Sequence, residues 1–387
     1  MGICWSESIK KGNVRNNETI IVDLPSRCSQ LNINKNYDIN YKETINKKIF
    51  EENNSNEMEK VTTNPKGLIN LGLSCYMNSL LQCLYYIKDL RNYFINKKDS
   101  FSSEQRISKA LSRTMYMLKN DLNENIAPEE FKNVIGKKNS LFFGVKAADA
   151  KDLFFNLIDS LLLELSNNDS FSSSHRSYNF TNKLDIFNQA KKEVDQKCII
   201  NKLFIGYYET EYHCPKGKNV YSYESNSFIL FNMENILKYY KEENLSLKNC
   251  FEYYSRLQEK SSFFCSFCNQ THENTCIEKI FQPPKILVII LDRGKGKIYR
   301  GKVDFDLNIN LKKYIDKDNQ CYSPNYQLIG VINHSGESSS SGHYTACCLT
   351  DENDKKYYFF SDEFKEPIRG KEINKYESYL LFYQNIN

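Results

Sequence analysis

Long apolar runs are missing from this sequence, and so is any strong excess of charge. No apolar stretch approaches the roughly 20 residues of a membrane-spanning helix, so we expect no transmembrane segment. The formal net charge is only +4, and no basic stripe with interleaved aromatic residues is visible. Recognition of nucleic acid normally requires such a stripe, so we expect no nucleic-acid partner.

A secretory signal is also missing, although the chain contains 13 cysteines. Disulfides form mainly in secreted proteins, whereas this chain is long and its number of cysteines is odd. We therefore interpret the cysteines as reduced thiols and expect a cytoplasmic protein. The chain does have core material, because 387 residues with 27 tyrosines and 24 phenylalanines suffice for one large domain or two ordinary ones.

The first six residues, MGICWS, fit the pattern for N-myristoylation of Gly2 after removal of Met1. Cys4 lies close enough to receive a second acyl chain, and basic residues follow. Because a single myristoyl chain binds membranes weakly, a durable anchor needs such a second signal. We predict peripheral attachment to the cytoplasmic face of a membrane through acylated Gly2 and Cys4. The alternative is an ordinary disordered start.

Residues 16–64 are polar, rich in Asn, Lys and Glu, and show little periodicity. This composition provides too little apolar surface for a core, so residues 1–63 are predicted to form a disordered extension. The pair Asn64-Pro65 marks its end, and residues 64–387 are predicted to form one folded domain.

The most informative stretch is GLINLGLSCYMNSLLQCL, residues 67–84. Its apolar residues recur at helical spacing from Met77 onward, which predicts an amphipathic helix with Cys75 in the first turn. A cysteine there faces unpaired backbone N–H groups and the positive end of the helix dipole, which favour the nucleophilic thiolate. We therefore expect chemistry at Cys75, and the alternative is a small buried cysteine at a helix start.

The pattern GLxNLGxSCYMNSxLQxL resembles the Cys box of the ubiquitin-specific proteases. These papain-like cysteine proteases cleave after the C-terminal glycine of ubiquitin. Leu73 stands where the family often has Asn or Ala, which changes a loop side chain and leaves the nucleophile in place. The resemblance implies that Cys75 is the nucleophile and that Asn70, with nearby backbone N–H groups, stabilises the oxyanion.

A second segment, AADAKDLFFNLIDSLL, resembles the family's second box, although Ala147 replaces the leading Gln of that box. Its apolar residues form a helical stripe that a core helix alone would explain. The resemblance implies that this helix borders the tail of ubiquitin, where Asp149 or Asp152 could face an arginine. The alternative is a pair of solvated surface carboxylates.

Residues 326–346 fit YxLxGVxxHxGxxxxxGHYxA and resemble the family's His box. The resemblance makes His343 the general base and gives His334 a structural role. A base needs a partner that orients its ring, and the family places Asp or Asn directly after the next strand. Here Ser361 occupies that position and Asp362 follows, so both are candidates. For each, the alternative is an exposed turn residue.

The family's zinc ribbon uses two CxxC pairs, but three cysteines remain here: Cys214, Cys265 and Cys268. Gly217 stands where the fourth cysteine belongs, and His213 or His272 could replace it as a ligand. We expect a degenerate ribbon stabilised by packing rather than bound zinc. The reaction itself would require no cofactor.

Together these segments predict an α+β papain-like fold of the ubiquitin-specific protease type over residues 64–387. A thumb of helices, a palm of mixed sheet and a fingers-like β extension would bind ubiquitin and ubiquitinated proteins. The predicted activity is that of a thiol-dependent deubiquitinase, in which His343 takes the proton of Cys75. The alternative is a membrane-tethered ubiquitin-binding scaffold with little turnover, which Ala147, Ser361 and the incomplete ribbon would favour.

Overall fold

The structure is a computed structural model, and it describes one unit of the chain, which contains residues 65–387. The described residues are 65–166, 198–217, 219–242, 244–256, 258–265, 267–294, 301–316, 323–338, 341–351, 353 and 355–386. The predicted extension 1–63 and its acylation motif lie outside them. None of the described helices is long and apolar enough to cross a membrane.

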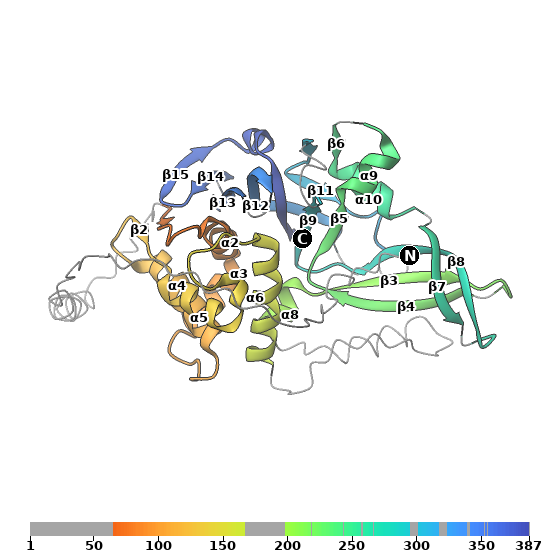
Figure 1. Ribbon diagram of the computed structural model, residues 1–387, viewed down its shortest axis with the longest axis horizontal. Helices are drawn as coiled ribbons and strands as arrows, with labels where there is room; N and C mark the ends of the chain where they lie inside the picture. Colours follow the sequence, from red (N-terminus) through yellow and green to blue (C-terminus); the bar gives the residue numbers. More distant parts are fainter. Residues whose placement is uncertain are drawn as a thin grey trace, which may run out of the picture. The chain divides into compact units, whose positions relative to one another are not determined.

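Helices from the first half of the described chain gather beside the largest sheet and form the thumb (Figure 1). They are α2 (Cys75–Tyr85), α3 (Lys88–Asn96), α4 (Arg106–Asn120), α5 (Glu129–Lys138), α6 (Ala150–Leu165) and the short α8 (Ile199–Phe204). Between α5 and α6 lies one 3-10 turn, η1 (Ser140–Phe142). A parallel pair of short strands, β1 (Gly67–Leu68) and β2 (Asn125–Ile126), connects the start of this region with α4 and α5.

The helix predicted with Cys75 in its first turn is present as α2, but it is buried on all sides instead of exposing a polar face. Its polar residues can be buried because they bond to the chain before the helix. Asn78 Nδ2 donates to the Leu68 carbonyl at 3.2 Å, and Gln82 Nε2 donates to the Lys66 carbonyl at 2.8 Å. These bonds hold the segment before Cys75 against the helix that Cys75 begins.

The apolar stripe predicted for the second box is present on α6 and is buried. Phe154 from this stripe packs edge-on against Phe382 of the large sheet, with ring centroids 6.1 Å apart. The helix begins at Ala150 because the Asp149 side chain accepts a hydrogen bond from the Lys151 backbone N–H. The start of α6 is therefore fixed against the palm.

The palm is an eight-stranded sheet with the order β15-β14-β13-β12-β16-β9-β5, and β11 pairs with β12 off this path. Its strands are β5 (Ile229–Asn232), β9 (Ile286–Asp292), β11 (Asn308–Asn310), β12 (Asn325–Ser338), β13 (Ser341–Asp351), β14 (Lys356–Ser361), β15 (Phe364–Ile368) and β16 (Ser378–Asn385). All neighbours are antiparallel except β5 and β9. Strand β9 is buried through Leu291, as its continuous apolar sequence predicts.

Short elements connect the palm to the rest of the chain. Between β5 and the second pair of fingers strands lie α9 (Met233–Tyr240), β6 (Leu245–Ser246) and α10 (Leu247–Tyr254). Strand β6 pairs in parallel with β10 (Val303–Asp304), and a 3-10 turn, η2 (Gly370–Lys375), precedes β16.

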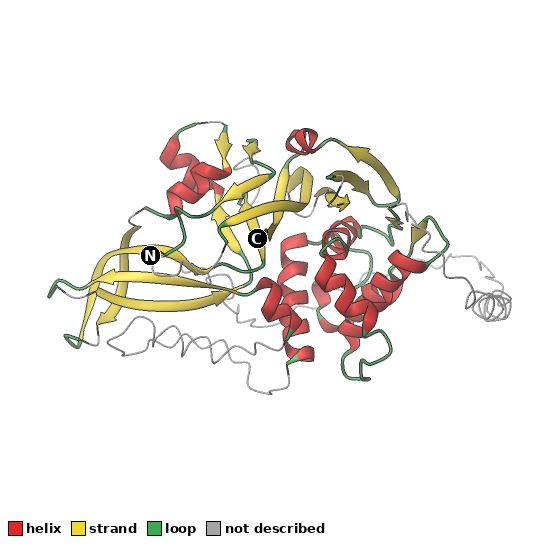
Figure 2. Cartoon of the chain, turned by 180° about the vertical axis from the view of Figure 1, so that it is seen from behind, coloured by secondary structure: helices red, strands yellow, loops and turns green. Residues whose placement is uncertain are grey.

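A four-stranded antiparallel sheet with the order β4-β3-β8-β7 forms the fingers, to the right in Figure 1. Its strands are β3 (Gly206–His213), β4 (Asn219–Asn226), β7 (Gln258–Cys265) and β8 (Gln270–Gln282). Figure 2 shows the thumb helices gathered in one region, apart from the fingers sheet, and a smaller pair of helices beside the palm strands. This arrangement confirms the predicted α+β class.

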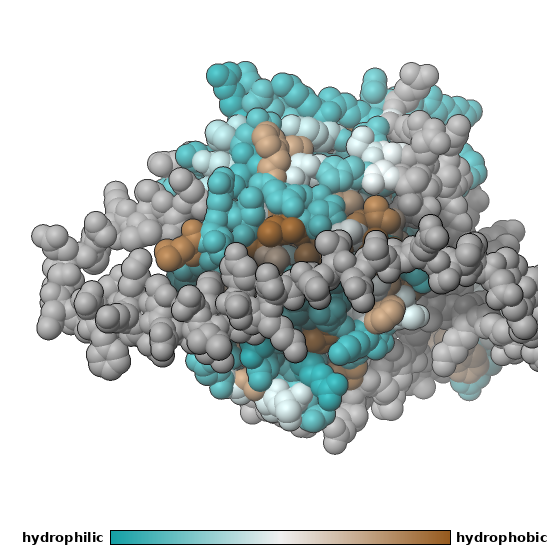
Figure 3. Space-filling view, turned by 60° about the vertical axis from the view of Figure 1, so that its left-hand side comes forward, coloured by the Kyte–Doolittle hydropathy of each residue, from teal (hydrophilic) through white to brown (hydrophobic). Residues whose placement is uncertain are grey.

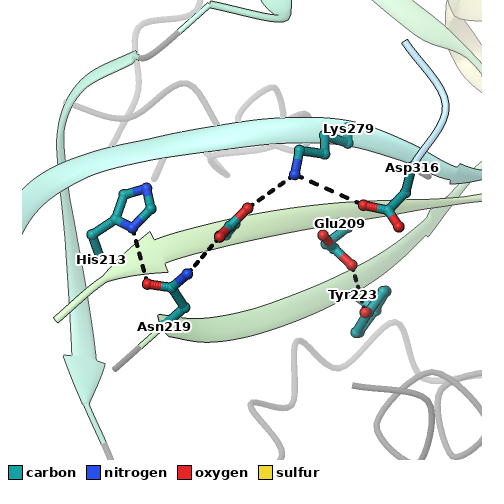
Figure 4. A network of polar contacts seen from close by, with 7 residues as sticks. Glu209, His213, Asn219, Tyr223, Lys279 and Asp316 are labelled. Atoms are coloured by element: carbon teal, nitrogen blue, oxygen red, sulfur yellow. Dashed lines mark hydrogen bonds and ion pairs between the residues drawn. The ribbon is translucent and has the colours of Figure 1, made fainter. Parts of the chain in front are cut away.

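Polar contacts join the fingers to the segment that leads into the palm (Figure 4). Lys279 Nζ lies 3.0 Å from Glu211 Oε2 and 3.8 Å from Asp316 Oδ2. The Asp316 backbone N–H also donates to the Ile280 carbonyl at 2.8 Å. Within the sheet, the buried carboxylate of Glu209 accepts a hydrogen bond from Tyr223. The fingers are thus fixed at their base by charge as well as by β pairing.

The face drawn in Figure 3 shows hydrophobic residues scattered among hydrophilic ones on the described part of the chain. Such scattering is ordinary for the surface of a folded domain.

Candidate active site

Cys75 begins α2, and the residue before it leaves the helix start uncapped. The Ser74 hydroxyl accepts a hydrogen bond from the Leu71 backbone N–H at 2.9 Å and makes no capping bond to α2. The first N–H groups of the helix therefore have no intrahelical acceptor. Those of Cys75 and Tyr76 act on the Cys75 sulfur and lower the pKa of its thiol, and Cys75 as a whole is 9% exposed.

The thiol of Cys75 nevertheless does not ionise easily. Burial raises its pKa above the usual value, and this effect outweighs the N–H groups of Tyr344 and of the helix start. The nearby carboxylate of Asp362 raises the pKa further. The prediction that the helix start favours a thiolate was therefore wrong in its net direction, and the thiol needs a base.

His343 lies on β13, next to the residue whose backbone N–H faces the Cys75 sulfur. The two motifs, far apart in the sequence, are thus brought together where α2 meets β13. The His343 Nε2 atom lies 2.8 Å from Ser361 Oγ, which leaves Nδ1 as the second ring nitrogen. No hydrogen bond joins the sulfur of Cys75 to His343, although both residues are described.

The two candidate orienting residues occupy different places at the end of the β14–β15 hairpin. Ser361 contacts the imidazole of His343, whereas the Asp362 carboxylate does not. Asp362 Oδ2 accepts from Asn70 Nδ2 at 2.7 Å, and Oδ1 accepts from Asn78 Nδ2 at 2.8 Å. Neither is simply an exposed turn residue, because each binds a different part of the site.

Asn70 is held at both ends of its side-chain amide. Its Oδ1 accepts hydrogen bonds from the backbone N–H groups of Gly72 at 3.0 Å and of Ser74 at 3.1 Å. Its own backbone N–H donates to Glu363 Oε1 at 3.1 Å. These contacts fix the amide nitrogen on the side of Asp362, close to the start of α2.

The carboxylates of the second box are not simply solvated. Tyr379 donates its hydroxyl to both oxygens of Asp149, at 2.9 Å each. Burial raises the pKa of Asp149, and burial together with the charge of Asp149 raises that of Asp152. Ala147, in place of the family's Gln, is exposed two residues before Asp149.

His334 packs against the ring of Tyr344. Its ring centroid lies 4.4 Å from that of Tyr344, and burial lowers the pKa of its imidazole. Its Nε2 is buried and has no hydrogen-bond partner among the described residues. Packing against Tyr344, the neighbour of His343, agrees with the structural role expected for it.

The incomplete ribbon of the fingers has a fourth donor after all. The ligand atoms of one group lie within 4.8 Å of one another: Cys214, Cys265, Cys268 and His272. Cys214 Sγ lies 3.8 Å from both Cys268 Sγ and His272 Nε2. Sulfur ligands of a tetrahedral zinc would stand about 3.8 Å apart, so the donor types and the Cys214–Cys268 distance fit that metal. Cys268 Sγ and His272 Nε2 lie 2.8 Å apart and would have to separate to hold it. His213 is not part of this group, and its Nδ1 contacts Asn219 at 3.0 Å.

Two further residues of the site were not expected. Asn78 donates a hydrogen bond to Asp362. The sequence signal for its role was its position in the Cys box, one helical turn after Ser74. Tyr379 binds Asp149, but its sequence context is an ordinary buried strand. No local pattern sets it apart.

Comparison with known proteins gives a consistent result. A family model described as "Ubiquitin carboxyl-terminal hydrolase" matches residues 66–383. Ubiquitin carboxyl-terminal hydrolase 4 of Arabidopsis thaliana is 27% identical over 296 residues, covering 70% of this chain and 77% of that protein. Hydrolase 8 of Saccharomyces cerevisiae is 24% identical over 352 residues, covering 82% and 70%. Yeast hydrolase 12 is 32% identical over 178 residues, but the match spans 40% of this chain and 14% of that protein.

Solved structures show the same fold. The SAGA DUB module Ubp8/Sgf11/Sus1/Sgf73 bound to monoubiquitin contains a chain that aligns with a TM-score of 0.66 and 20% identity. The alignment covers 89% of this chain and 75% of that chain. The same module bound to ubiquitin aldehyde gives a TM-score of 0.64 at 20% identity, with 83% and 70% covered.

Proposed function

The chain belongs to the ubiquitin carboxyl-terminal hydrolase family of cysteine-type deubiquitinases, and we propose that it hydrolyses the bond after the C-terminal glycine of ubiquitin with Cys75 as nucleophile. The observation that carries the proposal is the contact between α2 and β13. Across this contact the Tyr344 backbone N–H acts on the Cys75 sulfur, at a helix start without a side-chain cap. His343, the residue before Tyr344, has its Nε2 atom 2.8 Å from Ser361 Oγ, which supports its role as the base.

His343 is the general base in this proposal. Because burial raises the pKa of the Cys75 thiol, its proton must be removed as attack begins. Nδ1 is the ring nitrogen for this transfer, since Nε2 is 2.8 Å from Ser361 Oγ. A hydroxyl can both donate and accept, so Ser361 orients the ring without selecting one tautomer as a carboxylate would.

The thiolate attacks the carbonyl carbon, and the negative charge that forms on the carbonyl oxygen is stabilised by the α2 N–H groups and by Asn70 Nδ2. The amine then leaves with the proton from His343. Water, activated by the same imidazole, hydrolyses the thioester and releases ubiquitin. No cofactor takes part in these steps.

The partly buried carboxylates at the start of α6 would bind the basic tail of ubiquitin. Asp149 is held in place by Tyr379, and Asp152 follows on the same helix turn. Carboxylates that are desolvated in this way pair more strongly with an arginine than surface carboxylates do. The structural relatives were solved with ubiquitin bound, which supports the same partner for this chain.

We expect the chain to release a fluorophore from the C-terminus of ubiquitin faster than from ubiquitin-like modifiers with different tails. A panel of fluorogenic modifiers, measured as kcat/KM, tests this expectation. Binding of ubiquitin without turnover, and without labelling by a ubiquitin carrying a C-terminal electrophile, would instead support the scaffold alternative.

We also propose that the Cys214, Cys265, Cys268 and His272 group holds a structural zinc ion. The fit of the donor set supports this proposal, because three thiols and one imidazole are a common zinc ligand set. The metal would supply a cross-link between the β3–β4 and β7–β8 ends of the fingers. It would have no part in bond cleavage.

Attachment to the cytoplasmic face of a membrane is proposed from the sequence MGICWS alone. In cells, replacement of Gly2 by alanine is expected to move most of the protein from the membrane fraction to the soluble fraction, because the acyl acceptor is lost. Fractionation with a Cys4→Ala variant as comparison shows whether a second chain adds to the anchor. An unchanged distribution of the Gly2→Ala variant would exclude the anchor.

A further inference from the structure

Asp362 follows Ser361 directly in the chain, yet its carboxylate serves a different part of the site. The turn between β14 and β15 holds Asp362 at a φ of 53°, in the left-handed region that Asp tolerates better than most residues. In this conformation both carboxylate oxygens accept hydrogen bonds from side-chain amides, those of Asn70 and Asn78. These two asparagines flank Cys75 in the sequence.

The contacts of Asn70 determine which of its hydrogens remains for substrate. Its oxygen faces two backbone N–H donors, those of Gly72 and Ser74, so its nitrogen must face the carboxylate of Asp362. One of the two Nδ2 hydrogens is bound by Asp362. No described residue accepts the second, which is therefore left for an oxygen bound at the start of α2.

We propose that Asp362 is a positioning residue for the oxyanion donor Asn70, not for His343. This inference rests on the proposed function. When sulfur forms its bond to the carbonyl carbon, the π electron pair of the carbonyl moves to oxygen. That pair returns when the C–N bond breaks and the amine takes the proton of His343. A donor fixed in advance by a charge-assisted hydrogen bond stabilises this transient charge best.

The charge of Asp362 gives the proposed role a distinct signature. Burial is the main cause of the raised pKa of Cys75, and the Asp362 carboxylate raises that pKa further because it disfavours a neighbouring thiolate. Removing the charge should therefore ease ionisation of the thiol while it weakens stabilisation of the oxyanion. Replacing a residue that orients His343 would instead slow both ionisation of the thiol and hydrolysis.

The test compares Asp362→Asn with Ser361→Ala in two reactions of the full chain. Hydrolysis of a ubiquitin C-terminal amide needs both the thiolate and the oxyanion donor. Alkylation of Cys75 by iodoacetamide, followed by mass spectrometry of the Cys75 peptide, needs the thiolate only.

For Asp362→Asn we expect kcat to fall about 10- to 100-fold, because removal of an oxyanion donor costs about 10²- to 10³-fold and this variant leaves the donor present but misplaced. Alkylation should be as fast as in the wild type or faster, with its pH profile moved to lower pH. For Ser361→Ala we expect slower alkylation at neutral pH, because the base is less well held. Glu366→Gln removes a charge from the exposed face of the same hairpin and should change neither reaction.

A double-mutant cycle guards against a merely structural effect of the substitution. If Asp362 acts through Asn70, Asp362→Asn should reduce kcat much less in an Asn70→Ala background than in the wild type. Independent effects, slowed alkylation in Asp362→Asn, or unchanged kcat would each overturn the inference while wild-type turnover upholds the proposed function. A wild-type chain without turnover would overturn both.

Discussion

Replacement of Cys75 by alanine is expected to abolish hydrolysis of a ubiquitin C-terminal amide, with a loss on the order of 10⁵-fold or more. In the proposed mechanism the Cys75 thiol forms the acyl intermediate, and neither the oxyanion donors nor His343 can replace it. The substitution removes one sulfur atom from a helix that is otherwise packed by its neighbours. The variant should therefore fold and still bind ubiquitin.

Turnover and covalent labelling by a ubiquitin with a C-terminal electrophile measure this effect together. Cys83→Ala is the matched control, because Cys83 is a buried cysteine of the same helix and its sulfur packs 3.8 Å from that of Cys348. Labelling should disappear in Cys75→Ala and persist in Cys83→Ala. Labelling that persists in Cys75→Ala would show that another thiol is the nucleophile.

The sequence was sufficient to predict that the Cys and His boxes would lie together. Their residues follow a fixed order, and α2, which begins at Cys75, does pack against β13, which contains His343, although 268 positions, from 75 to 343, separate the two residues. The core helix α6 and the buried strand β9 were also predictable, because their apolar residues follow the period of a helix or form one continuous run. Because hydrophobic periodicity reflects local backbone geometry, it can be recognised in a sequence without knowledge of the fold.

Which of two adjacent residues would orient the histidine could not be predicted from local pattern. Ser361 ends a strand, and Asp362 lies in the turn with a positive φ, so their side chains reach different neighbours. The conformation of that turn is set by the pairing of β14 with β15 and by the amides of Asn70 and Asn78. These two residues lie 292 and 284 positions before Asp362 in the sequence. A position in a motif does not contain this information.

The net acidity of Cys75, and the choice between His213 and His272 that the sequence left open in the fingers, could not be settled for a similar reason. The helix start does direct N–H groups at the sulfur, but burial depends on β13 packing above α2, and burial has the larger effect on the pKa. His272 joins the cysteines because β7 and β8 pair antiparallel, which returns the chain toward Cys268. Both effects arise from tertiary contacts.

Replacement of Cys268 by serine is expected to have the largest effect on the fingers. If the four-residue group holds zinc, the purified wild-type chain should contain about one zinc ion, and the variant almost none, because a serine hydroxyl is a poor substitute for a thiolate ligand. Loss of the metal should reduce the stability of the fingers by several kcal/mol, about the magnitude expected of a structural site. Elemental analysis and thermal unfolding measure the two effects.

The same variant separates ubiquitin binding from chemistry. The fingers would hold the folded body of ubiquitin, whereas Cys75 and His343 belong to the thumb and palm, so KM should rise more than kcat falls. Alkylation of Cys75 by iodoacetamide should be unchanged. Cys276→Ser, on the same β8 strand but outside the cluster, is the matched control for burying a hydroxyl, and it should retain the metal. Wild-type protein that contains no zinc, or a Cys268→Ser variant that unfolds like Cys276→Ser, would show that packing alone holds the fingers together.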